Sequence, residues 1–498
     1  MMRKSSSFRE NFVRNGLAVG LTAGVGVAGA QPLKVEQSTP PPKNPLSFYD
    51  GKLVLDVQDR LRLEVRDNTY DFNSAHNVST DDTFLLQRFR LGLTIKPCSS
   101  FKAYFQGQDT REIDGERKRV PFVLGAEGDD PFDLRQGYFE FGDLAEFPLS
   151  AKVGRQEIAY GDERLIGVSD WNNFSRTFDA AKVRYQDNNH KFWVDAFAAH
   201  VVLIEDEGPS ENRNFHFNES NWNDTFAGFY GSTTAFPIQT TEAYFLYRNK
   251  ASSNPVYVDT LGNRARPFDI QQEIYTVGLR AKSTPGKLHG FDYELEGAYQ
   301  FGRAAGTIGS AYPNATGTSL EHSAFACMVR GGYTLEETPW KPRLGLEYDV
   351  ASGDSNPNDD KDESFLNLFP TNHKFYGYMD LFAWKNIHDP SVSLKMTPHP
   401  AVSLQLDGHA FWLYTNQDAW YRANAVTQVR PLNAAALSAD RFAGTELDLT
   451  VGYTPYKWLK LLAGYSHFFA GQYLSDTRTA TAGNDDANFG YLQATFIF

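Results

Sequence analysis

The chain has 498 residues, of which 41% are hydrophobic, 14% aromatic and 22% charged, and its formal net charge is −13. The length would suit two or more soluble domains, but the middle of the chain has no helical heptads, no glycine-rich phosphate loop and no linker, so one large sheet is the simpler interpretation. No run of 18 apolar residues occurs, which excludes a membrane-spanning helix.

The amino terminus has the organisation of a targeting segment. Four basic residues lie between Arg3 and Arg14, residues 17–29 are apolar and rich in Gly and Ala, and Ala28-Gly29-Ala30 is a small-x-small cleavage site. We therefore expect a signal peptide over residues 1–30 and a proline-rich periplasmic lead-in over 31–50. The folded domain is expected to be a single barrel over residues 51–498.

Alternation with a period of two begins at Leu53. Up to Val65 the odd-numbered positions are apolar except Asp59, and from Asp56 to Arg66 the even-numbered positions carry charged or amide side chains. The same pattern recurs over residues 88–96, 275–282 and 291–301. Because no helical segment is available to cover the apolar faces, apolar-out and charged-in strands favour a barrel in the bacterial outer membrane.

Thr-Pro pairs predict the tight turns. They occur at 284–285, 338–339, 397–398 and 454–455, and each interval is long enough for two strands and one long loop. We therefore expect an all-β, transmembrane antiparallel β-barrel of about 18 strands (16–18), with short periplasmic turns, long outer loops and a water-filled lumen. Residues 488–498 alternate and end in an aromatic residue, as the closing strand of such a barrel does.

Four polar segments are predicted to be outer loops or lumen plugs, namely 205–223, 302–319, 352–363 and 474–486. The third contains the acidic residues Asp354, Asp359, Asp360, Asp362 and Glu363, which could bind a divalent cation together with lipopolysaccharide phosphate. A solvated loop is the preferred interpretation, so neither a metal site nor a cofactor is predicted. Cys98 and Cys327 are expected to be unpaired.

An enzymatic role is the weakest hypothesis. An outer-membrane hydrolase would need a nucleophile, a base and an acid at one site, and His373, His388, His409 and His467 have no spacing that singles out such a set. Aromatic residues near the predicted strand ends are most simply interfacial girdles. We expect contacts with outer-membrane lipid and no nucleic-acid partner.

Two groups of local motifs suggest a family. The first group comprises Val153–Ile158, Tyr160–Gly167, Asp170–Asn173 and Arg176–Ala180, and the second comprises Ala351–Asp354 and Leu368–Asp380. Together they resemble the alginate-export family of outer-membrane porins, from about Leu53 to the carboxy terminus. The resemblance implies an 18-stranded barrel whose arginine-rich constriction passes an anionic polyuronate outward, with periplasmic export partners.

Passage of a carboxylate polymer needs fixed cations at successive positions, and arginine is suited because its planar fork matches a carboxylate. The candidate contacts are Arg62, Arg88, Arg90, Arg155, Arg176, Lys182, Arg184, Arg280 and Arg330. Alternation places Arg62, Arg88, Arg90, Arg184 and Arg280 on the inward face, whereas Arg155 shares a phase with Val153 and is included through the motif alone. The alternative is a general or small-solute porin, in which inward arginines pair with inward acids and the lumen is self-neutralised.

Overall fold

The structure is a computed structural model that describes residues 46–75, 81–115, 130–189, 191–204, 217–251, 257–258, 264–265, 272–306, 318–430 and 432–498. The predicted signal peptide, and the predicted lead-in as far as residue 45, lie outside these ranges. In the ranges described, no helix combines the length and the apolar character needed to span a membrane.

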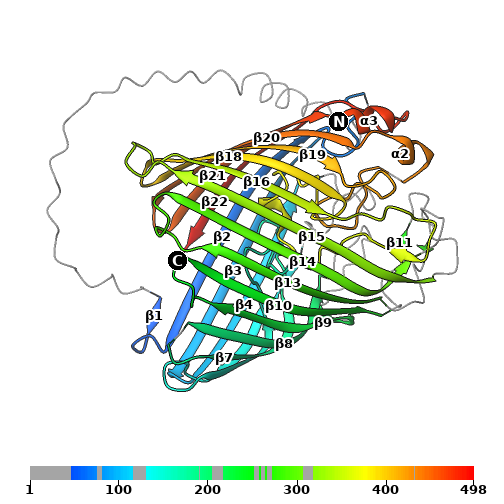
Figure 1. Cartoon of the computed structure of the whole chain (residues 1–498). Coiled ribbons are helices and arrows are strands. Elements are labelled where there is room, and N and C mark those ends of the chain that lie inside the picture. Colours follow the sequence, from blue (N-terminus) through cyan, green and yellow to red (C-terminus); the bar gives the residue numbers. More distant parts are fainter. Residues whose placement is uncertain are drawn as a thin grey trace, which may run out of the picture. The chain divides into compact units, whose positions relative to one another are not determined.

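Eighteen antiparallel strands form a closed barrel (Figure 1). They are β2 (Leu53–Asp67), β3 (Asp82–Cys98), β4 (Phe101–Ile113), β5 (Asp130–Phe141), β6 (Leu149–Gln156), β7 (Phe178–Gln186), β8 (Phe192–Leu203), β9 (Glu219–Thr233), β10 (Gln239–Lys250), β13 (Gln272–Ser283), β14 (Phe291–Gly306), β15 (Thr318–Thr334), β16 (Arg343–Ala351), β18 (Ile387–His399), β19 (Val402–Leu413), β20 (Phe442–Tyr456), β21 (Leu459–Ala470) and β22 (Ala487–Ile497). The barrel closes because β2 pairs with both β3 and β22.

The remaining elements are short. Strand β1 (Ser47–Phe48) pairs with β2, β17 (Lys361–Asp362) lies parallel to β15, and β11 (Tyr257–Val258) pairs with β12 (Arg264–Ala265). A 3₁₀ turn, η2, spans Asn372–Lys374, and the short helices α2 and α3 span Ala434–Ser438 and Gln472–Asp476.

The predicted architecture is confirmed, including the closing strand and the spacing of the turns. Pro285 and Pro339 lie in the connections β13–β14 and β15–β16, and each Thr-Pro interval holds two strands. Pro398 and Pro455 lie just before the turns, among the last residues of β18 and β20, where the pairing with the next strand shifts register. A bulge accommodates proline at these positions because a bulged residue needs no ladder hydrogen bond.

Two of the predicted loops are shorter than expected. Strand β9 begins at Glu219, inside the predicted loop 205–223, and β14 and β15 extend through both ends of the predicted loop 302–319. Polar residues continue these strands because a barrel wall that reaches past the membrane into water no longer needs apolar side chains on its outer face. The centres of both loops lie outside the described residues.

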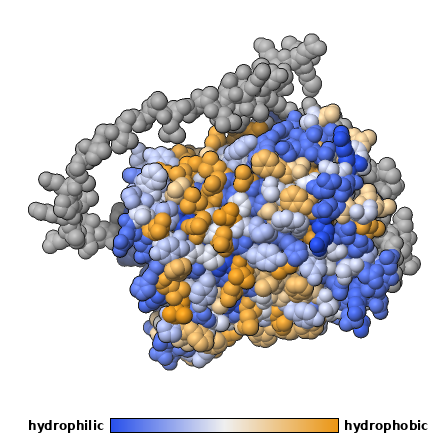
Figure 2. Space-filling model, turned by 45° about the horizontal axis from the view of Figure 1, so that its top comes forward, coloured by the Kyte–Doolittle hydropathy of each residue, from blue (hydrophilic) through white to orange (hydrophobic). Residues whose placement is uncertain are grey.

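The two faces of the wall differ as the alternation predicts. Outward residues such as Leu279 (64% exposed) and Leu346 (65%) are apolar, whereas inward neighbours such as Arg280 (5%) are polar and covered. Figure 2 shows apolar residues gathered over broad areas of the outer surface, with hydrophilic residues toward its margins. The free cysteines Cys98 and Cys327 are both exposed.

Candidate functional site

Three long connections fold into the barrel rather than away from it. Two of them contact inward residues of distant strands, and the third packs against the second and against Phe468 of β21. Inner loop A is residues 157–177 between β6 and β7, inner loop B is residues 352–386 between β16 and β18, and inner loop C is residues 414–441 between β19 and β20. The lumen is therefore occupied by chain as well as by wall side chains.

Inner loops A and B are joined by backbone hydrogen bonds. The Gly167 N–H donates to the Phe369 carbonyl at 2.8 Å, and the Phe369 N–H donates to the Leu165 carbonyl at 2.8 Å. The Thr371 N–H donates to the Glu163 carbonyl at 2.9 Å, which continues the pairing toward η2. These residues belong to the two groups of motifs identified in the sequence, and the structure brings the two groups together in the lumen.

Arginines of β2 and β3 hold inner loop A through Asp170. Arg60 and Arg88 donate to the Asp170 carbonyl at 2.7 and 3.0 Å, and Arg88 and Arg90 donate to its carboxylate oxygens at 3.1 and 3.0 Å. Burial alone would raise the pKa of Asp170, but Arg88, Arg90 and Arg60 outweigh burial and hold it below the ordinary aspartate value. Arg60, Arg88 and Arg90, called the arginine clamp below, fix the loop. Arg88 and Arg90 therefore face a carboxylate of the protein itself.

Arg62 holds the next residue of the same loop. It donates to the Trp171 carbonyl at 2.6 Å and to Glu64 at 2.7 Å, and its guanidinium lies 3.7 Å from the centre of the Trp171 ring. The other side of the indole stacks on His373 of inner loop B, with ring centroids 3.7 Å apart and an interplanar angle of 9°. A cation–π contact and a ring stack therefore connect the wall to both loops.

Arg164 anchors inner loop A to the opposite wall. Its side chain is fully covered and donates to Asp349 at 2.7 Å, to the Tyr376 hydroxyl at 3.1 Å and to Glu347. Both acids are on β16, which lies seven strands from β3 by the shorter way round the barrel. Inner loop A thus crosses the lumen and is held by ion pairs at both ends.

Arg280 and Arg330 belong to one central network of ion pairs. Arg280 contacts Glu242 and lies 2.6 Å from Glu294, and Arg330 contacts Glu294 and lies 2.6 Å from Asp162 of inner loop A. Arg280 also lies 4.0 Å from Glu296, and Arg330 lies 3.7 Å from Glu347. The two arginines therefore contact five acids, and Glu294 bridges them.

Lys182 and Arg184 share a single buried acid. Arg184 donates to Asp195 at 2.6 and 2.9 Å, Lys182 lies 3.3 Å from the same carboxylate, and the Tyr160 hydroxyl donates to it at 2.7 Å. Both cations remain partly exposed, with 20% of the Lys182 side chain and 29% of the Arg184 side chain accessible.

The last two candidates lie away from the open lumen. Arg176 donates to the carbonyls of Gly167 and Pro370 at 2.7 and 3.1 Å, and burial lowers its pKa to about 10. Arg155 forms a two-point pair with Asp179 at 2.9 and 3.0 Å on the outer face, which the alternating register assigns to it together with the exposed Val153. Arg155 is therefore not a lumen contact, because alternate residues of a strand face opposite sides.

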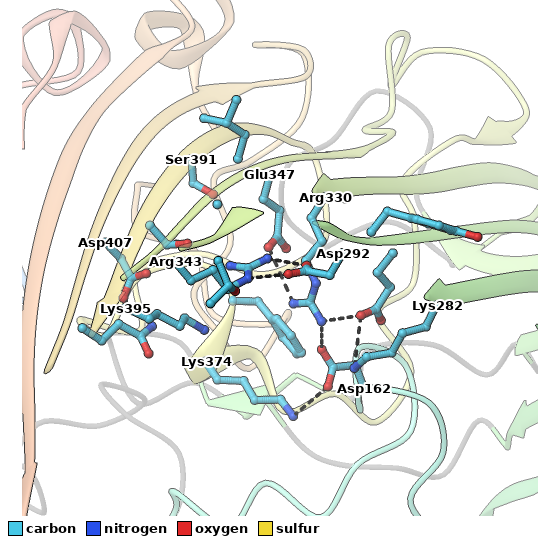
Figure 3. A pocket seen from close by; sticks show the side chains of 18 of the residues that line it. Asp162, Lys282, Asp292, Arg330, Arg343, Glu347, Lys374, Ser391, Lys395 and Asp407 are labelled. Carbon is cyan, nitrogen blue, oxygen red and sulfur yellow. Dashed lines mark hydrogen bonds and ion pairs between the residues drawn. The ribbon is translucent and has the colours of Figure 1, made fainter. Parts of the chain in front are cut away.

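A cavity of about 580 Å³ lies near the short turns and is called the turn-side cavity below (Figure 3). Its wall comes from β13–β16, β18–β20 and inner loops A and B. Five cations line it: Lys282, Arg330, Arg343, Lys374 and Lys395. Seven acids line it as well: Asp162, Asp292, Glu294, Glu336, Glu347, Asp407 and Asp448. Carboxylates therefore outnumber Lys and Arg around this cavity.

The candidate residues named from the sequence did not include Arg60 or Arg164. The alternation places Arg60 on the same inward face as Arg62, so the pattern offered it as a candidate equally well. Arg164 lies in a loop without periodicity, and its role depends on contact with acids 183 and 185 residues further along the chain. Such a contact leaves no local signal in the sequence.

Comparisons with known proteins agree with this architecture. A family model described as alginate export matches residues 56–488. The fold resembles Acinetobacter baumannii OccAB1, with a TM-score of 0.55 at 12% identity over 90% of this chain and 96% of that one. Pseudomonas aeruginosa OpdQ has a TM-score of 0.53 at 11% identity, over 90% of this chain and 98% of that one. None of the curated proteins matches the sequence.

Proposed function

Because the chain belongs to the alginate-export family and forms an outer-membrane channel barrel, we propose that it passes anionic solutes by passive diffusion, and specifically a polyuronate such as alginate. The single observation that supports this proposal is a series of partly exposed lumen cations beyond the arginine clamp. Lys182, Arg184, Lys282 and Lys374 keep 20%, 29%, 44% and 38% of their side chains exposed.

Exposed cations suit transport because they attract a carboxylate without requiring it to lose all its water. A polymer that must keep moving needs several weak contacts in series rather than one tight site. Partly hydrated lysine and arginine side chains provide contacts of that kind. Export of a polymer would also require periplasmic partners to deliver it.

The second candidate is a small-solute porin with a self-neutralised lumen. It is favoured by the ion pairs of Arg280, Arg330 and the arginine clamp, and by the excess of acids around the turn-side cavity. Such a lumen would discriminate weakly between anions and cations, because paired charges present little net field to a passing ion.

Reversal potential across a planar bilayer under a salt gradient separates the two candidates. Anion selectivity, together with block of the current by added polyuronate, is the result expected for the proposed function. Weak or cation selectivity without block would leave the self-neutralised porin.

A paired substitution tests the arginine clamp in the same assay. Replacing Arg88 and Arg90 with alanine removes two positive charges from the lumen and is expected to reduce anion preference. Unchanged selectivity in this variant would show that the arginine clamp holds inner loop A without contributing to ion selectivity.

A further inference from the structure

We propose that the anion-binding site of this channel is a basic patch on β4, β6 and β7, made of Lys102, Lys152, Lys182 and Arg184, and that it binds carboxylate groups of the solute. This inference rests on the proposed function and locates its binding site. Lys182 and Arg184 were expected from the sequence, whereas Lys102 and Lys152 come from the strand register.

The register places two lysines directly opposite each other. Lys152 on β6 pairs with Lys182 on β7, and both lie on the inward face. Like charges directly opposed across a sheet destabilise it, so this arrangement costs the wall stability. An anion that lies between the two ammonium groups would offset that cost.

Lys152 lacks an acidic partner in the part of the chain that the structure describes. Its Nζ lies 3.7 Å from the centre of the Tyr138 ring, and no described carboxylate lies within 4.0 Å of it. Its cross-strand neighbour Glu140 instead lies 3.6 Å from Lys102. The nearby Glu157 is paired with Arg135 at 2.5 Å.

The charges of the patch therefore do not cancel. Four cations face two carboxylates, those of Glu140 and Asp195, and Asp195 is shared by Lys182, Arg184 and the Tyr160 hydroxyl. The patch keeps an excess of two positive charges. The turn-side cavity has the opposite balance, because seven acids line it against five Lys and Arg side chains.

The patch is also reachable from the lumen. The side chains of Lys102 and Arg184 are 36% and 29% exposed, so their charges are partly hydrated rather than sealed in the wall. Lys102 is the second residue of β4 and Arg184 lies two residues before the end of β7, so both are close to short periplasmic turns, and Lys152 lies in the turn-side half of β6. A solute entering from the periplasm would therefore meet the patch before inner loop A.

The ligand chemistry is that of a carboxylate on a polar solute. Lysine and arginine donors recognise carboxylates by charge-assisted hydrogen bonds. The half-buried Trp193, with the Arg184 guanidinium 4.1 Å from its ring centre, adds an aromatic surface at the edge of the patch. A single uronate and a polymer of uronates share this chemistry, and the experiment distinguishes them by length.

The test uses the full-length barrel in planar bilayers, with monomeric galacturonate, oligogalacturonate and neutral maltotetraose as probes. The double substitution K152Q/K182Q is compared with wild type and with K457Q, which removes an exposed lysine from a periplasmic turn. Correct folding of each variant is checked by the heat-dependent mobility of the barrel on gels.

K152Q/K182Q is expected to raise the half-blocking concentration of oligogalacturonate about tenfold, which corresponds to ~1.4 kcal/mol for two lost charge contacts. K457Q and the conservative variant K152R/K182R should block like wild type, and maltotetraose should not block at all. Block by oligogalacturonate but not by galacturonate identifies the polymer as the ligand. Equal half-blocking concentrations of the two probes, when expressed per carboxylate group, identify small anions as the ligand.

If oligogalacturonate blocks K152Q/K182Q as it blocks wild type, the basic patch is not the anion-binding site, while the proposed function stays intact. If wild type itself shows neither anion selectivity nor block, both the proposed function and the assignment of the basic patch are refuted. The wild-type measurement therefore separates the two failures.

Discussion

Replacing Arg164 with methionine should release inner loop A from the wall of the barrel. Arg164 is fully covered and is paired with Asp349 at 2.7 Å and with Glu347, both on β16. Removing one partner of a buried ion pair typically costs about 3–5 kcal/mol, because the remaining charge is left buried and uncompensated. Glu347 keeps a contact with Arg330 at 3.7 Å, so the lower end of that range applies.

A loss of about 3 kcal/mol corresponds to roughly a hundredfold shift in the equilibrium between the docked and the released loop. Because inner loop A crosses the lumen, its release should widen the passage. Single-channel recordings of R164M should therefore show more frequent states of high conductance than wild type.

The double variant R164M/D349N tests the cause of this effect. It removes the uncompensated charge along with the arginine, so its recordings should lie closer to wild type than those of R164M. The matched control is R111Q, which breaks a pair with Asp109 that is 37% exposed on the arginine side and should change little. Identical recordings from R164M and wild type would refute the anchoring role of Arg164.

Two further predictions concern inner loop B. Burial, assisted by nearby acids such as Asp362, raises the pKa of Asp354 to about 7. The folded loop therefore holds a proton that the unfolded chain would release, so this contribution to stability is present at low pH and is lost as the pH rises toward 7. Hydrogen exchange of the loop, corrected for intrinsic rates, should increase from pH 5.5 to 8 in wild type and less in D354N; equal increases would count against the assignment. Gly377 has φ +80° and a Cβ there would lie 2.5 Å from the Glu446 carboxyl group, so G377A should destabilise loop docking by more than ~1 kcal/mol and increase current noise. G286A, at φ +73° with open space around it, measures the backbone strain alone, and equal noise in both variants would show that the contact with Glu446 is unimportant.

The inner loops explain why most of the predicted arginines have protein partners. Loop A brings Asp162 and Asp170 into a lumen whose wall is rich in arginine, and the arginines bind these acids and the loop carbonyls. A charge inside the barrel can therefore shape the passage without touching the solute. This distinction separates the arginine clamp from the basic patch, where the acids are too few to neutralise the cations.

The strands could be predicted because their signal is local. Alternation from Leu53 onward indicates β2, and the aromatic carboxy-terminal segment indicates β22, each from residues within one strand. The spacing of Pro285, Pro339 and the later Thr-Pro pairs then indicates how many hairpins the chain contains. Compartment and strand number follow from the same repeated pattern.

The sequence by itself determined the barrel, its closing strand and which face of each strand is charged. Only the tertiary structure decided which long loops turn inward and that Asp170 and Arg164 hold inner loop A at its two ends. It also decided that Lys152 stands opposite Lys182 with no carboxylate of the described residues within 4.0 Å of its ammonium group. The physical reason is that a side chain's face depends on its immediate neighbours in a strand, whereas its partner depends on closing the sheet and on folding loops that are far apart in the sequence.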